Sequence, residues 1–103
     1  NPATVQWIHR QLGWAAFLTA IVLWIGPPDR KNPPGSLRRF TTALALLTIL
    51  QFGLGIATLV YGVPVALGVA HQTGAALIVV TLALIGHTLR SIPTAPPSLT
   101  RRA

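Results

Sequence analysis

Residues 40–61, FTTALALLTILQFGLGIATLVY, contain no charged residue and are long enough to cross the ~30 Å hydrocarbon core of a bilayer as one helix. Two further apolar stretches flank them, at residues 2–26 and 64–89. Because backbone polar groups inside lipid must be satisfied internally, all three stretches are predicted to be helices. The expected fold class is therefore all-α, an integral membrane helical bundle with three transmembrane helices within residues 1–90.

The segments that follow these stretches contain many helix-breaking residues. GVP at residues 62–64 predicts a tight turn, so the second and third helices should form an antiparallel hairpin. GPPDRKNPPG at residues 26–35 cannot continue a helix, because it is rich in proline and glycine. Residues 91–103, SIPTAPPSLTRRA, are predicted to be an extended or disordered Pro/Arg-rich tail.

Composition excludes several kinds of chemistry within this chain. The 103 residues are 51% hydrophobic and only 9% charged, whereas soluble domains average about 25% charged residues. There is no cysteine, which excludes disulfides, thiolate-bound metals and a cysteine nucleophile. Asp29 is the single acidic residue, so paired-carboxylate catalysis is excluded as well.

The basic residues predict an orientation in the membrane. The net charge is +7, and all basic residues except Arg10 lie in or beside the first loop and the tail. With three helices, that loop and that tail share one side, which the positive-inside rule makes cytoplasmic. We therefore expect a multi-pass protein of the cell membrane with its first residues and the 62–64 turn facing outward. We expect no binding to nucleic acid.

Two histidines are predicted to lie at the same depth. His9 follows Pro2 by seven residues, and His71 follows Pro64 by seven. Proline suits the first position of a helix, and both helices enter from the outer side. Each imidazole should then lie about 10 Å along its helix. Two imidazoles at one depth on different helices are what axial ligation of a heme iron needs.

The sequence alone also allows other roles for the two histidines and the small residues beside them. A histidine near the membrane surface is often a polar anchor, and two histidines without a nearby acid make an incomplete zinc site. The small residues beside the histidines either allow close helix packing or leave room for a flat ligand; they are Gly13, Gly68, Gly74 and Ala75.

Four polar side chains need separate interpretations. Arg10 either extends to lipid headgroups or pairs with an anionic group such as a heme propionate. His87 should lie about 24 Å further along its helix than His71, near Arg90, as an interfacial anchor. Gln51, and Gln72 beside His71, are expected to hydrogen-bond between helices.

Three segments resemble the heme A synthase family. They are NPATVQWIHR at residues 1–10, QFGLGIATLV at 51–60 and VPVALGVAHQ at 63–72. The resemblance covers most of the chain apart from the first loop and the tail. It implies an eight-helix enzyme made of two four-helix halves, each with a histidine pair. One half would hold heme O, whose methyl group is oxidised to the formyl group of heme A, and the other a b-type heme.

The chain resembles the last three helices of the C-terminal, heme b-binding half. The resemblance makes His9 and His71 the heme-iron ligands. The N-terminal half typically has a glutamate, thought to be catalytic, three residues before its His-Arg motif, and Gln6 stands at that place here. No catalytic residue is therefore assigned to this chain, and activity is expected only of a complete protein.

The expected partners follow from this resemblance. They are the missing N-terminal half or homologous helices, heme O bound in that half, and the lipid bilayer; a homo-oligomer is compatible with them. Two alternatives to the enzyme are kept. One is a non-enzymatic bis-His cytochrome b-type membrane anchor or electron carrier, and the other is a structural subunit without a cofactor.

Overall fold

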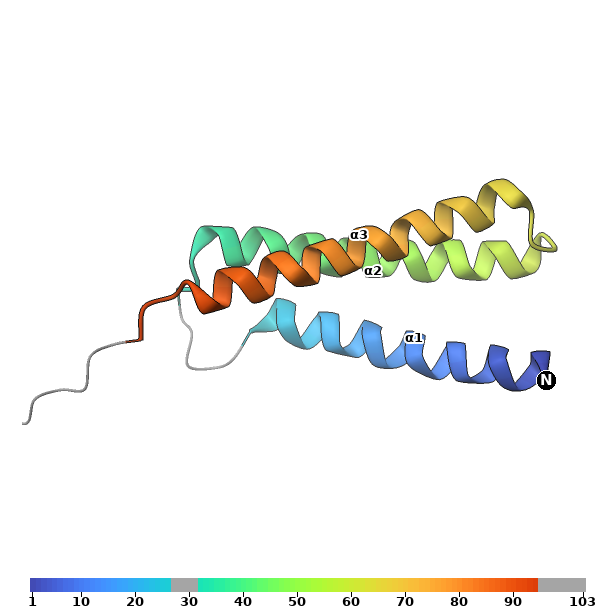
Figure 1. Ribbon diagram of the computed structural model, residues 1–103, viewed down its shortest axis with the longest axis horizontal. Coiled ribbons are helices and arrows are strands. Elements are labelled where there is room, and N and C mark those ends of the chain that lie inside the picture. The colour runs from blue at the N-terminus through green and yellow to red at the C-terminus, as the bar shows by residue number, and fades with distance from the viewer. Residues whose placement is uncertain (27–31, 95–103) are drawn as a thin grey trace, which may run out of the picture.

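The computed structural model describes residues 1–26 and 32–94, and within them the chain forms three long helices. They are α1 (Pro2–Ile25), α2 (Gly35–Val60) and α3 (Val65–Arg90). Figure 1 shows α2 and α3 as an antiparallel hairpin with α1 alongside. Residues 27–31 of the predicted first loop and 95–103 of the predicted tail lie outside the described residues.

The helices begin where proline and capping residues permit. The Asn1 side chain accepts a hydrogen bond from the Ala3 N–H at 3.0 Å, directly before Pro2. α3 begins just after Pro64. α2 begins at Gly35, directly after Pro34 and five residues before the apolar stretch at Phe40. Hydropathy predicts the part of a helix that lies in lipid. The helix itself begins earlier, directly after the last residue that would interrupt it.

A tight turn joins α2 to α3, as expected. Gly62 and Val63 have φ angles of 73° and 58°, in the left-handed region that β-branched residues rarely adopt. The Val63 N–H donates to the Thr58 carbonyl at 2.7 Å. This bond satisfies a carbonyl at the end of α2, and the chain then reverses direction into α3.

α2 is the central helix of the bundle. It packs against both α1 and α3, whereas no Cα atom of α1 comes within 8 Å of a Cα atom of α3. A small apolar core, with side chains from all three helices, is formed by Ala20, Leu37, Leu44 and Ile85. α1 and α3 are therefore held relative to each other mainly through α2.

Most apolar side chains point away from this core. All three helices are long and apolar enough to cross a membrane, and little of each is buried within the bundle. Seven threonine hydroxyls donate to the carbonyl four residues earlier, as where Thr48 donates to the Leu44 carbonyl at 2.7 Å. Helices that are apolar all round suit lipid or further transmembrane helices.

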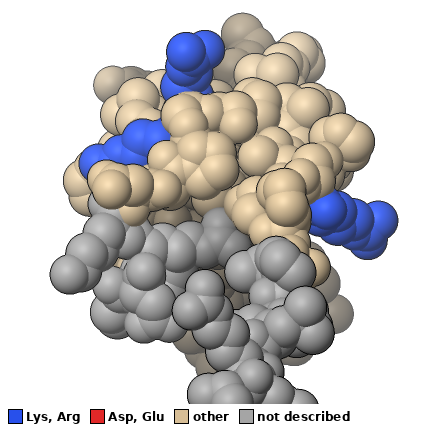
Figure 2. Space-filling model, turned by 90° about the vertical axis from the view of Figure 1, so that its left-hand side faces the viewer, with Lys and Arg blue, Asp and Glu red and all other residues tan. Residues whose placement is uncertain are grey.

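The two ends of the bundle differ in charge. The turn end carries Asn1 and the Gly62–Pro64 turn, and the basic end carries the residues around Gly26, Arg38 and Arg90. Arginine side chains of the described residues protrude at the basic end in Figure 2. There Arg38 donates to the Trp24 carbonyl at 3.3 Å, which satisfies a free carbonyl at the end of α1.

Candidate functional site

His9 of α1 and His71 of α3 meet near the turn end. Their ring centroids are 6.0 Å apart and their planes differ by 72°. This contact joins two helices whose backbones do not approach each other. The two imidazoles therefore lie at one depth, as their equal spacing from Pro2 and Pro64 predicts.

The His71 ring rests against a glycine of α2. A Cβ atom built on Gly55 would lie 3.1 Å from Cε1, 3.7 Å from Nδ1 and 3.8 Å from Nε2 of His71. Any other residue at this position would press on the ring. His71 is half-buried there, and its Nδ1 is buried without a hydrogen-bond partner among the described residues, whereas His9 is exposed.

Gln51 of α2 holds the same segment of α3. Its Nε2 donates to the His71 carbonyl at 2.7 Å, which is the interhelical hydrogen bond expected for a buried amide in lipid. Its Oε1 is buried against Gly74, where a Cβ atom would collide with it. Gln72, next to His71, is exposed instead.

The structure separates the two roles that were open for the small residues. Gly74 allows close packing, because Gln51 fills the space beside it. Gly13 and Gly68, four residues after His9 and three before His71, have no described heavy atom within 4 Å of where a Cβ atom would lie. These two glycines leave space open beside the histidine pair.

The histidine pair has a spacing that fits one metal ion between the rings. A metal–imidazole bond is about 2 Å long, so two imidazoles on opposite sides of one ion have ring centres about 6 Å apart. No group of three or more His, Cys, Asp and Glu residues that could hold a metal occurs within residues 1–26 and 32–94. The described residues thus bring two imidazoles together, and any further ligands of a metal held between them would have to come from a bound group.

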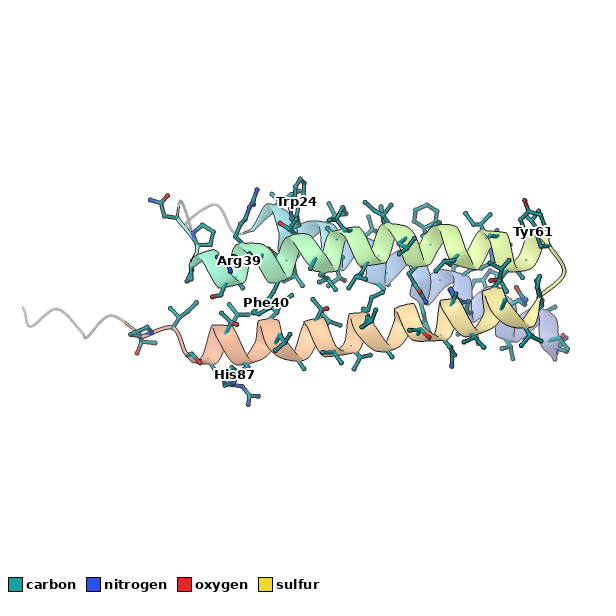
Figure 3. All side chains as sticks on the ribbon, turned by 90° about the horizontal axis from the view of Figure 1, so that it is seen from above. Trp24, Arg39, Phe40, Tyr61 and His87 are labelled. Atoms are coloured by element: carbon teal, nitrogen blue, oxygen red, sulfur yellow. The ribbon has the colours of Figure 1, made fainter. Side chains whose placement is uncertain are left out.

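Arg10 and His87 lie apart from each other. Arg10 follows His9 on α1 and is exposed at the turn end. His87 is exposed in the last turn of α3, at the basic end, as Figure 3 shows by its distance along the bundle from Tyr61. It therefore lies far along the bundle from the His9–His71 pair.

An aromatic cluster between α1 and α2 was not anticipated from the sequence. Phe52 lies 5.0 Å from Trp14 and 5.7 Å from Phe17, measured between ring centroids. Phe17 lies eight residues after His9, about two turns further along α1. The unusual depth of Trp14 for an interfacial tryptophan was the signal that could have revealed this contact.

Comparisons with known proteins agree on one family. Residues 1–83 match the COX15-CtaA family, described as cytochrome oxidase assembly protein. The chain is 38% identical over 89 residues to heme A synthase of Rhizorhabdus wittichii, covering 86% of this chain and 24% of that protein. It is 36% identical over 91 residues to heme A synthase of Nitrosospira multiformis, covering 87% of this chain and 25% of that protein.

A third relative extends the match to the whole chain. Heme A synthase of Rhodospirillum centenum is 38% identical over 107 aligned positions, covering 100% of this chain and 26% of that protein. No solved structure matches the chain. The chain spans about a quarter of the length of these curated relatives. By its sequence, the chain belongs to the heme A synthase family.

Proposed function

We propose that His9 and His71 are the axial ligands of one b-type heme, bound near the outer face of the membrane. The observation that carries the proposal is the 6.0 Å separation of their ring centroids across two helices. The open space at Gly13 and Gly68 supports it, because a porphyrin between the rings must extend past both helices. The charge pattern supports the outer side, since the basic end lies opposite.

The residues present suit a heme better than a bare metal ion. A porphyrin supplies the four equatorial nitrogens, so only two protein ligands are required. Zinc would need two more protein ligands or waters in an apolar setting. When bound, heme supplies one-electron redox chemistry, and this chain's residues hold and orient it and limit its contact with water.

In the complete protein, this region would support the oxidation of the heme O methyl group to the formyl group of heme A. The names of its relatives, heme A synthase, support a role in making heme A, and the oxidation of heme O is what the family resemblance implies. Gln6 lies three residues before His9, where a carboxylate could act as an acid or base. We therefore place the oxidation of heme O in the remaining helices and give this chain the second, non-substrate heme.

Pigment analysis of the complete protein tests this function. The protein purified from membranes should contain non-covalent b-type heme with low-spin spectra, and cells that supply heme O should accumulate heme A. Production of b-type heme spectra without heme A would favour the non-enzymatic cytochrome. Absence of a Soret band under heme-replete expression would reject the heme site and favour a structural subunit without a cofactor.

Arg10 is proposed to pair with a heme propionate. It follows His9 directly at the turn end and is exposed, and a guanidinium forms strong paired hydrogen bonds with a carboxylate. Arg10→Gln should lower heme affinity by about ten-fold, which corresponds to ~1.4 kcal/mol. Heme titration of the apoprotein checks this. Arg39→Gln, at the basic end, is the control, and equal small effects would leave Arg10 only a lipid-headgroup role.

A further inference from the structure

α2 carries neither histidine, yet it makes the described contacts that orient one of them. A Cβ atom on Gly55 would lie 3.1 Å from Cε1 of the His71 ring, and 3.7 and 3.8 Å from its two nitrogens. A methyl group there would turn or displace the imidazole. The orientation of the His71 imidazole ring is therefore limited by how closely α2 approaches α3.

Gln51 fixes the backbone that carries the same imidazole. Its hydrogen bond to the His71 carbonyl is 2.7 Å long and partly buried. Gly74 leaves room for the amide, because any side chain at that position would occupy the place of Oε1. Sliding or rotation of α3 at His71 would break this bond in an apolar setting, where a lost polar partner is costly.

The two contacts act on one segment of α3. Gln51 and Gly55 are four residues apart and share a face of α2, while His71 and Gly74 are three apart and share a face of α3. Gly55 limits the orientation of the imidazole ring, and Gln51 fixes the position of the main chain that carries it. His9, by comparison, is exposed on α1.

We propose that Gln51 and Gly55 are positioning residues that set the height and plane of the His71 imidazole relative to His9. The inference rests on the proposed heme ligation. The 72° angle between the rings is close to perpendicular. The relative orientation of two axial imidazole planes determines the splitting of the iron d orbitals. It therefore determines the anisotropy of the low-spin ferric electron paramagnetic resonance (EPR) signal.

The first test compares two glycines of α2 in the complete heme-loaded protein. Gly55→Ala should shift the g values of the His9–His71 heme and its midpoint potential, because the new methyl group forces the His71 ring to rotate. Gly53→Ala should leave both unchanged, since no described heavy atom lies within 4 Å of the new methyl group. Equal spectra for the two variants and the parent protein would overturn the role of Gly55.

The second test addresses Gln51, and it stays informative if Gly55→Ala fails to fold. Gln51→Leu should lower heme affinity about ten-fold, the lower end of the range for residues that support a ligand, and shift the EPR signal. Gln72→Leu, the same change at an exposed neighbour of His71, should do neither. Matching effects of both substitutions would reject the positioning role of Gln51.

A double substitution checks that Gln51 and Gly74 act together. Gly74→Ala should disturb the EPR signal in the parent protein but cause little further change in the Gln51→Ala background, where the colliding amide is gone. Additive effects would contradict the coupling. If the parent protein itself shows no bis-imidazole signal, the heme ligation fails. If that signal is present but insensitive to these changes, only the positioning role fails.

Discussion

His71→Ala should abolish the six-coordinate low-spin heme of the His9–His71 site in the complete protein. In the proposed site, the substitution would remove one of the two ligands and leave only the His9 ring, which lies 6.0 Å from the His71 ring in the structure. Loss of a bond worth even 1.4 kcal/mol lowers affinity about ten-fold. We therefore expect most of this heme to be lost on purification and any remainder to be high-spin. Optical spectra and heme content per protein measure both effects.

His87→Ala is the matched control for this change. His87 lies on the same helix and is exposed at the basic end, so its loss should leave heme content and spectra as in the parent protein. External imidazole should restore a low-spin spectrum to His71→Ala by occupying the vacated position. Identical spectra for His71→Ala and the parent protein would remove His71 from the ligand set.

Phe52→Ala should also weaken heme binding, although Phe52 is not expected to touch the iron. α1 has no backbone contact with α3, and Phe52 of α2 is the central aromatic contact for Trp14 and Phe17 of α1. Its truncation should cost about 1–3 kcal/mol, less than the ~3–5 kcal/mol of a fully buried phenylalanine. His9 would then be held less firmly opposite His71, so the EPR lines should broaden and heme should dissociate faster.

Phe40→Ala separates this effect from a general loss of stability. Phe40 also lies on α2 but packs against the apolar core toward the basic end, away from His9 and His71. The two variants should lose comparable thermal stability in detergent, whereas only Phe52→Ala should speed heme dissociation. Equal heme dissociation rates at equal stability would show that the aromatic cluster does not position His9.

Much of the fold follows from hydropathy and proline. Three apolar stretches and the demand for internal backbone hydrogen bonds are enough to predict three helices. Pro2 is the first residue of α1 and Pro64 directly precedes α3, so the two prolines mark the starts of these helices to within one residue. The depth of His9 and His71 follows from counting residues, because the rise per residue of an α-helix is fixed.

Contacts between helices could not be predicted in the same way. Counting residues gives depth along a helix but not which face meets a neighbour when every face is apolar. Gly53 and Gly55 look alike in sequence, yet only Gly55 lies against His71. Gly13 and Gly74 likewise flank histidines at similar spacings, and one leaves open space while the other packs against Gln51. The central place of α2 also depends on these packing choices.

An experimental structure of the complete protein with its hemes bound tests the central claim most directly. We predict one iron atom lying between His9 and His71, bonded to one ring nitrogen of each, at the turn end of α1 and α3. A heme at this level bound by other residues, or the two imidazoles pointing apart into lipid, would contradict it.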